Sequence, residues 1–158
     1  MSITPDDFRA ALGRFATGVT ILTTRDAKGG DHGMTVNALA SVSLAPPLIL
    51  VCIANDADMH PVLKHATAFA LSVLASDQEA LSRRFAEEPD NRFDGVPFTR
   101  SASGVILIGG AHAHIECRHV SWSEAGDHGV CVAEVERTAI GVGEPLLYYR
   151  GAYTRLQP

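Results

Sequence analysis

The chain is poor in the residues that form covalent cross-links and membrane spans. It has three cysteines in 158 residues, Cys52, Cys117 and Cys131, and no Cys-x-x-Cys pair. The odd count and the apolar, strand-like surroundings favour buried free thiols over a disulfide or a zinc site. No apolar run approaches the roughly 20 residues of a membrane helix, and the first eight residues lack the apolar core of a secretory signal. These absences predict a cytoplasmic protein with no membrane partner.

Positive charge is also scarce. Lys and Arg number 13 against 18 Asp and Glu, which leaves a net charge of −5 with histidine neutral. That balance argues against a nucleic-acid partner, because a phosphate backbone selects clustered basic residues. The adjacent arginines Arg83 and Arg84 lie either on a solvated helix face or where they supply charge to a phosphate.

The usual signatures of nucleophilic and acid–base catalysis are missing too. The chain has no nucleophile motif and no paired carboxylates, and the segment 141–143 (Gly-Val-Gly) is too short for a dinucleotide fingerprint. His112 and His114 share one face of a predicted strand, so they are candidates for a metal pair. Glu116 and Cys117 lie on opposite faces and complete no ligand set, so two partly exposed strand histidines are the competing interpretation.

The sequence does contain many short β-type segments and few helices. Thr4, Pro5 and two acids predict a helix that begins there and presents one apolar face through Phe15. Ser76 and Glu79 predict a capping box for a helix to about Ala86, and a short helix is expected up to His65. Strands are expected at 19–24, 33–43, 48–53, 68–74, 105–108, 111–123, 129–142 and 146–156, with a hairpin turn at 26–31 and a polar loop at 87–97.

This order of elements predicts the fold class. Many strands at short spacing, without regular strand–helix alternation, argue against a doubly wound sheet. They favour a mainly β (α+β) protein, a Greek-key antiparallel β-barrel with two or three flanking helices. The length of 158 residues and the hydrophobic fraction of 46% fit one domain over residues 1–158.

The segment 33–43 differs from an ordinary core strand in its polar residues. Thr35, Asn37, Ser41 and Ser43 alternate with apolar residues, which is the period of a half-buried strand. One face would then carry short hydroxyls and an amide, which suits a flat polar ligand. An exposed strand face is the alternative.

Four blocks of sequence, in this order, carry a family resemblance. They are Phe15–Thr24, Gly33–Pro47, Gly126-Asp127-His128 and Pro145–Tyr153. Together they make the chain resemble, from about Phe8 to Leu156, the short-chain NAD(P)H:flavin oxidoreductases, which are the reductase components of two-component flavin-dependent monooxygenases.

The resemblance implies a fold, a reaction and partners. The fold would be the flavin-binding split barrel, as a homodimer with flavin near the subunit interface. The reaction would be hydride transfer from NADH or NADPH to FMN or FAD, and the reduced flavin would go to a separate monooxygenase. The alternative is a flavin-binding or storage protein of the same fold without nicotinamide-dependent turnover.

The resemblance also implies roles for individual residues. His128 would face the nicotinamide as a binding and, secondarily, a catalytic residue, and Tyr148, Arg150 and Gly151 would complete that pocket. The flavin-facing strand would contribute Thr35, Val36, Asn37, Ala38, Leu39, Ser41 and Val42. The end of the next strand and its loop would meet the phosphate through Cys52, Asn55, Asp56 and Met59, and the flavin would also be approached by Phe85, Arg92 and Phe93.

One departure from the family concerns the expected phosphate loop. Asp56 and Asp58 stand where a basic or hydroxyl residue is common, and carboxylates repel a phosphate. Either helix amides and Lys64 meet the phosphate, or the aspartates point away, or flavin binds weakly as a diffusible substrate. The acidic balance also favours NADH, because a 2′-phosphate is best bound by a guanidinium.

Overall fold

The computed structural model describes residues 2–157, which form a mainly β protein with three helices. No helix within this range is long and apolar enough to cross a membrane. The elements are α1 (Pro5–Leu12), β1 (Thr17–Gly18), β2 (Thr20–Arg25), β3 (Asp31–Val36), β4 (Leu39–Leu44), β5 (Pro47–Ala54), α2 (Met59–His65), β6 (Ala68–Val73), α3 (Glu79–Glu87), β7 (Phe98–Arg100), β8 (Ile106–Ile108), β9 (Ala113–Ala125), β10 (His128–Ile140), β11 (Leu147–Tyr149) and β12 (Ala152–Thr154).

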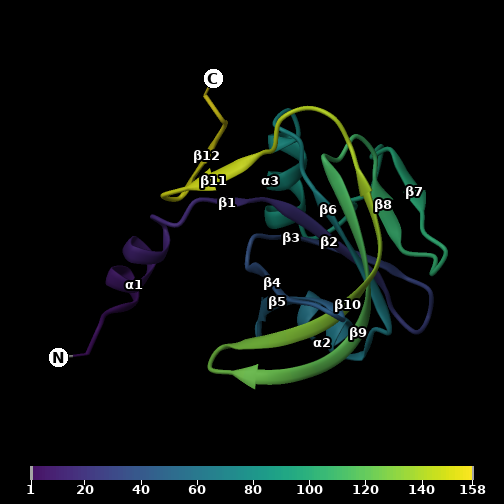
Figure 1. Ribbon diagram of the computed structural model, residues 1–158, viewed down its shortest axis with the longest axis horizontal. Coiled ribbons are helices and arrows are strands. Elements are labelled where there is room, and N and C mark those ends of the chain that lie inside the picture. Colours follow the sequence, from purple (N-terminus) through teal and green to yellow (C-terminus); the bar gives the residue numbers. More distant parts are fainter. Residues whose placement is uncertain (1, 158) are drawn as a thin grey trace.

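Most strands belong to one antiparallel sheet in the order β3-β2-β6-β9-β10-β5-β4 (Figure 1). Its longest pair is the hairpin of β9 and β10, whose register shifts twice between residues 132 and 137. Such irregularities add twist and bend the strands. β1, β11 and β12 form a small second sheet, and β7 pairs with β8.

The predicted single strand over 33–43 is wrong. The chain forms β3 and then β4, which lie at opposite edges of the seven-stranded sheet. β3 pairs with β2 and β4 pairs with β5, so the chain crosses between the edges at Asn37 and Ala38. The polar side chains therefore do not share one face: Thr35 belongs to β3, whereas Ser41 and Ser43 belong to β4.

Two apolar clusters form the core. The larger one lies between α2 and the main sheet, and the alternating burial of β5 is typical of a strand with one face inward. The smaller one lies under α3 and includes Phe85, Ile106 and Leu146, each at most 2% exposed. α3 and the C-terminal strands are thus tied to the sheet through the second cluster.

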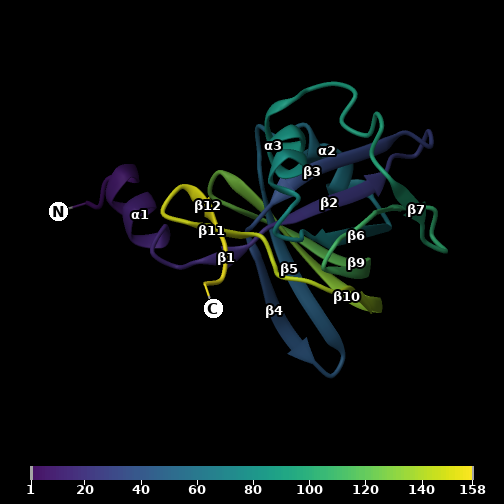
Figure 2. The same ribbon diagram turned by 90° about the horizontal axis from the view of Figure 1, so that it is seen from above.

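The first helix is shorter than its apolar pattern predicts. Thr4 and Asp7 form a capping box at the start, but α1 ends at Leu12. The carbonyl of Gly13 accepts the backbone N–H of Arg150, a tertiary contact that turns the chain toward β11. None of the residues of α1 is buried, and Figures 1 and 2 show the helix projecting from the body of the molecule.

Other expected boundaries also change. Ser76 forms no capping box, because α3 begins at Glu79 after Gln78, and the Gln78 side chain instead donates to the carbonyl of Gly109. The predicted strand 146–156 is split into β11 and β12 by a turn at Arg150 and Gly151, whose φ angles are 52° and 77°. β1 and β7 are short strands that periodicity does not predict.

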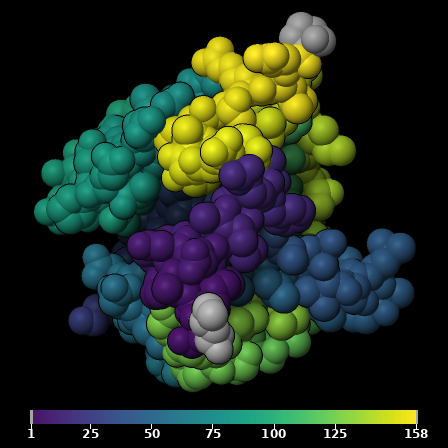
Figure 3. All heavy atoms as spheres, turned by 90° about the vertical axis from the view of Figure 1, so that its left-hand side faces the viewer, coloured from purple at the N-terminus to yellow at the C-terminus, as the bar shows by residue number. Residues whose placement is uncertain are grey.

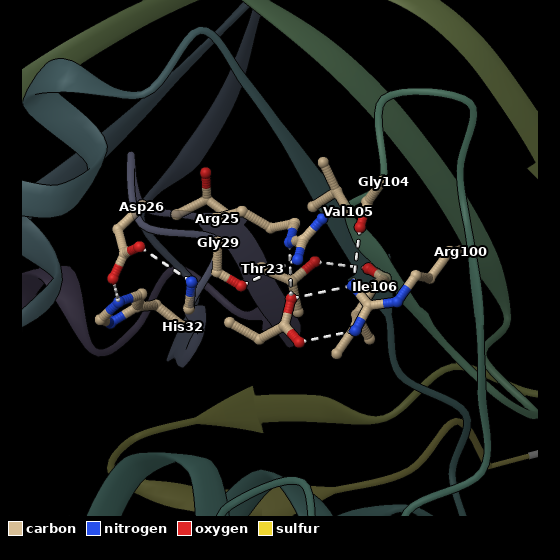
Figure 4. A network of polar contacts seen from close by, with 12 residues as sticks. Thr23, Arg25, Asp26, Gly29, His32, Arg100, Gly104, Val105 and Ile106 are labelled. Atoms are coloured by element: carbon tan, nitrogen blue, oxygen red, sulfur yellow. Dashed lines mark hydrogen bonds and ion pairs between the residues drawn. The ribbon is translucent and has the colours of Figure 1, made fainter.

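A network of charges fixes the hairpin of β2 and β3 to β7 and β8 (Figure 4). Arg100 donates to both oxygens of Asp31 at 2.9 and 2.7 Å, and Arg25 lies 3.3 Å from the same carboxylate. At the turn, His32 Nε2 lies 2.8 Å from Asp26 Oδ2. That hydrogen bond and the backbone N–H of Gly30 lower the pKa of Asp26 from 3.8 to about 2.

Candidate active site

The crossing from β3 to β4 places a short exposed piece of chain beside β5. The backbone N–H of Cys52 donates to the carbonyl of Ala38 at 3.0 Å, and the N–H of Leu39 donates to that of Asn37. Asn37 and Ala38 are exposed, and the Asn37 amide reaches Thr17 Oγ1 only at 3.3 Å. The crossing thus presents an amide side chain and backbone groups at the surface.

A cleft lies on one side of Asn37, and we call it the α3 cleft. Its volume is about 290 Å³, and it is lined by Val19, Thr35, Asn37, Arg83, Ala86, Glu87, Tyr148, Gly151 and Tyr153. A chain of contacts fixes its base: Thr35 Oγ1 donates to the Ser82 carbonyl at 2.6 Å, and Ser82 Oγ lies 2.8 Å from the hydroxyl of Tyr153. β3, α3 and β12 therefore hold one another in place around this cleft.

A groove lies on the other side of Asn37, between α1 and the edge of β4 and β5. We call it the α1 groove; its volume is about 420 Å³. Figure 3 shows the purple N-terminal segment packed beside the yellow C-terminal segment on this face of the molecule. The groove is mainly apolar, and its lining includes Phe8, Leu12, Phe15, Leu39, Leu50 and Cys52. Asn37, Tyr148 and Gly151 line both the groove and the cleft, so the two cavities adjoin.

The groove wall is apolar enough for a flat ring. Burial raises the pKa of the Cys52 thiol, so the thiol stays uncharged at neutral pH. Arg9 on α1 and Arg150, at the turn between β11 and β12, are the charged residues of its lining. Ligand sites of this kind combine apolar walls with a few polar groups that fix orientation. An isoalloxazine ring, which is flat with polar edges, fits this set of donors and walls.

A second group of predicted residues lies at the turn between β9 and β10. The backbone N–H of Asn55 donates to the Asp127 carbonyl at 2.9 Å, and His128 pairs with Ala54 in register. His128 Nδ1 lies 2.7 Å from Asp127 Oδ1, and this contact lowers the pKa of the Asp127 carboxyl. Asn55, Asp56 and His128 line neither the α3 cleft nor the α1 groove.

A third group lies at the opposite end of β3, around a cavity of about 490 Å³ that we call the loop cavity. Met59, Arg92 and Phe93 line it, and Arg92 Nη1 donates to the Gly33 carbonyl at 2.7 Å. Asp31, Asp58, Asp90 and Asp94 add carboxylates to its wall.

Several predicted side chains do not reach any of these cavities. Phe85 is fully buried against Phe93, and Val36 is 4% exposed in the larger core cluster. Ser41 and Val42 are exposed on the edge strand β4. Lys64, an alternative partner for phosphate, donates instead to Glu124 at 2.6 Å.

The two candidate metal histidines differ: His114 has a hydrogen-bond partner, whereas the buried Nδ1 of His112 has none within residues 2–157. His114 Nε2 lies 2.8 Å from the Ile108 carbonyl, and no group of three metal-ligating side chains gathers within residues 2–157. Cys117 and Cys131 are free, and burial raises the pKa of each thiol to about 12.

Sequence patterns did not predict that residues of α3 line the cleft. Arg83, Ala86 and Glu87 lie three and four residues apart, so they share one helix face. The spacing was visible, but nothing in the sequence says that this face meets Tyr153. Arg84 points elsewhere, toward the carbonyls of Asn91 and Asp94.

Comparison with known proteins gives one consistent result. A family model described as a flavin reductase like domain matches residues 12–157. The FMN reductase (NADH) SmoA of Agrobacterium fabrum is 45% identical over 148 residues, covering 94% of this chain and 84% of that protein. The reductase subunit HsaB of a flavin-dependent monooxygenase from Rhodococcus jostii is 37% identical over 158 residues, covering 99% and 80%.

A solved structure agrees with this result. The NADH:FAD oxidoreductase SgcE6 of Streptomyces globisporus, in complex with NAD and FAD fragments, superposes with a TM-score of 0.92 and 38% identity. The match covers 100% of this chain and 98% of that one. With the family model spanning nearly every residue and relatives well above 30% identity, the chain belongs to the flavin reductase like domain family.

Proposed function

We propose that the protein is a flavin reductase that transfers hydride from NADH to FMN or FAD. The observation that carries this function is the meeting of two cavities at Asn37, Tyr148 and Gly151. A reaction between two flat rings needs two adjoining sites and little else from the protein, because the cofactors carry the chemistry. Relatives named as NADH-dependent FMN and FAD reductases support the same reaction.

The residues at this junction position and shield the two ligands. The flavin, when bound, accepts the hydride. The Asn37 amide and the backbone of Ala38 and Leu39 hold the polar edge of its ring, and the apolar wall of the α1 groove excludes water. Tyr148 and Gly151, which line both cavities, and Arg150, which lines the α1 groove, are proposed to bind the nicotinamide where the two cavities meet. Holding both rings in contact removes translational freedom that free reactants would have to lose.

The loop cavity is our proposed site for the phosphate-bearing arm of the flavin, with Arg92 and Phe93 as contacts and Phe85 as support behind Phe93. Met59, which lines the loop cavity, and Asn55 and Asp56, which precede it in the chain and do not line the cavity, are proposed to approach the same arm. The carboxylates of this wall repel a phosphate, which favours weak binding and release. Reduced flavin then leaves for a separate monooxygenase, as in relatives named as reductase components.

His128 is proposed to act on the nicotinamide side. Its side chain is 43% exposed beside Asp127, outside both cavities of its own chain. Replacing His128 by Ala is expected to raise the KM for the nicotinamide more than the KM for flavin. A larger increase in the KM for flavin would mean that His128 acts on the flavin instead.

We also propose a homodimeric Greek-key split barrel. β3 and β4 lie at the two edges of the sheet but are separated by only two residues in the chain, which supports closure of the barrel at that point. Phe8, Leu12 and Phe15 are 55%, 52% and 76% exposed on or next to the unburied α1, and a second copy of the chain would cover them. Sedimentation of the protein at micromolar concentration tests the dimer, and a monomeric mass would rule it out.

We further infer that residues 1–158 form a single domain. We also infer that the protein is located in the cytoplasm, where its free thiols stay reduced.

The test of function is the oxidation of NADH and NADPH, followed at 340 nm without flavin and with FMN, FAD or riboflavin. Turnover that requires added flavin and saturates with it is the expected result, and it names the preferred flavin. If fluorescence quenching shows flavin binding but no nicotinamide is oxidised, the protein would instead be a flavin-binding or storage protein. Activity with bound flavin alone would mean that another acceptor is the substrate.

A further inference from the structure

The α3 side of the cleft is a charged wall that the transfer of hydride does not require. Arg83 and Glu87 line the cleft one helical turn apart, with Ala86 between them. Tyr153 faces them from β12. The cleft holds about 290 Å³, which is room for part of a dinucleotide and not for the whole of it. Its charge therefore acts on one portion of a bound ligand.

The Arg83 side chain already forms contacts with two other residues of the protein. Its Nε and Nη2 both donate to Glu79 Oε1, at 3.1 and 2.8 Å. Its guanidinium carbon also lies 4.7 Å from the centre of the Tyr153 ring. A guanidinium recognises phosphate best through a free fork of two donors. Glu79 therefore occupies one edge of the guanidinium, Nε and Nη2, and offsets the charge of Arg83, whereas the Nη1–Nη2 edge has no partner within residues 2–157. Arg83 thus presents less positive charge to a phosphate than an unpaired arginine would.

Glu87 is the charge that remains. The pKa of the Arg83 guanidinium is raised mainly by its hydrogen bond to Glu79 and, to a smaller extent, by the charge of Glu87. Within residues 2–157 the Glu87 carboxylate lies beyond hydrogen-bond and ion-pair distance of other side chains, and it is exposed along the cleft. Glu79 does not line the cleft but offsets the charge of Arg83, so Glu79, Arg83 and Glu87 together carry one net negative charge. A carboxylate accepts hydrogen bonds from sugar hydroxyls but repels a phosphate. Dinucleotide sites of other folds use the same contrast to separate NAD from NADP.

We propose that Glu87 makes the enzyme selective for NADH, by accepting a hydrogen bond from the adenosine ribose and repelling the 2′-phosphate of NADPH. The inference rests on the proposed function, because the nicotinamide must lie at Tyr148 and Gly151, where the cleft meets the α1 groove, for the adenosine portion to reach the α3 side of the cleft. Specificity then comes from a repulsive element rather than from extra contacts to the preferred donor.

The test compares kcat/KM for NADH and NADPH at saturating FMN. Glu87→Gln keeps the size of the side chain and its oxygen acceptor but removes the charge, so the preference for NADH is expected to fall about tenfold, mainly through a better KM for NADPH. Adding Glu79→Gln frees the fork of Arg83, and the preference is expected to fall further.

Glu88→Gln is the matched control. Glu88 is the next residue, its carboxylate lies 3.5 Å from Arg84 Nε, and it does not line the cleft. Its variant is expected to keep the wild-type preference within twofold. A second readout is salt: the wild-type preference falls as ionic strength rises, because added ions screen the repulsion, and the Glu87→Gln preference changes less.

Each outcome decides the inference separately from the function. Equal preferences in the Glu87→Gln and Glu88→Gln variants would overturn it. A change in the ratio of FMN to riboflavin use, with no change in the ratio of NADH to NADPH, would also overturn it, because the wall would then face the flavin phosphate. Absence of any nicotinamide oxidation by the wild type would instead refute the proposed function.

Discussion

The two ends of β3 are built in opposite ways. At its start, Asp31 receives two hydrogen bonds from Arg100, and His32 contacts Asp26. Phe85 and Phe93 leave no room for a Cβ on Gly33. At its other end Thr35 makes one side-chain hydrogen bond to α3, and the exposed Asn37 lies just beyond the strand. One strand thus has a fixed end and an open end.

The difference between the two ends of β3 shows how a rigid sheet can position exposed groups for a ligand. The fixed end sets the position of the strand, so the open end starts from a defined place. At the open end the exposed Asn37 amide makes only a long hydrogen bond to Thr17, so it is available to a ligand. Functional positions commonly lie where a rigid scaffold gives way to a connecting segment.

The largest expected effect is at the fixed end, for Gly33→Ala. The added Cβ would lie 2.6 Å from Phe85 Cε1 and 2.8 Å from Phe93 Cζ, both in packed aromatic rings. Overpacking of this kind costs about 1–3 kcal/mol of unfolding free energy, measurable by urea denaturation. Gly18→Ala is the control, since nothing lies within 4 Å of its added Cβ. Equal stability of the two variants would show that the fixed end is not tightly packed.

At the open end, Asn37→Leu is expected to weaken flavin binding about tenfold and to leave the unfolding free energy within about 0.5 kcal/mol of the wild type. The leucine removes a polar partner from the ligand while the protein loses only a long, exposed hydrogen bond to Thr17. Fluorescence quenching of titrated FMN gives the dissociation constant. An unchanged constant would contradict the placement of flavin at this crossing.

A smaller loss of stability is expected for Asp31→Asn. The carboxylate pairs with Arg100 and Arg25, but its side chain is 23% exposed and the arginines are 39% exposed, so solvent screens the pairs. We expect a loss of about 1 kcal/mol in thermal or urea unfolding. In a double-mutant cycle with Arg100→Gln, additive losses would mean that the pair contributes nothing.

The smallest effect concerns pH at the same end. The pKa of Asp26 is lowered to about 2 by His32 and by backbone N–H groups, so the ionised form is favoured by folding. Its contribution to stability is complete above its ordinary pKa of 3.8 and is lost as the pH falls toward 2. Urea midpoints measured from pH 5 to pH 2 should fall less steeply for Asp26→Asn. Parallel curves for the two proteins would show that Asp26 does not contribute to the loss of stability in acid.

Much of the fold follows from local patterns. The β-branched and apolar runs predict the strands of the main sheet, and the hydroxyl of Thr4 predicts the start of α1. The end of α1 does not follow, because Gly13 is bound by Arg150, 137 positions further on. The capping box at Ser76 fails for a similar reason: Gln78 satisfies Ala75 and Gly109 instead.

The candidate site was predicted in part. Asn37, Tyr148 and Gly151 do line adjoining cavities, whereas Phe85 and Val36 are buried in the core. Period-two alternation assigns faces correctly only while a strand continues, and the polar segment breaks at Asn37. His128 lies near Asn55 rather than near the cleft, which no spacing in the sequence indicates.

By itself, the sequence determined the mainly β class, the positions of most strands and the family to which the chain belongs. These depend on short-range periodicity and on blocks of residues in order. Only the tertiary structure decided that β3 and β4 lie at opposite edges of the sheet, that α1 has no buried residue, and that Glu87 and Tyr153 line the same cleft. Such features depend on contacts between segments far apart in the chain, whose energies no local pattern records.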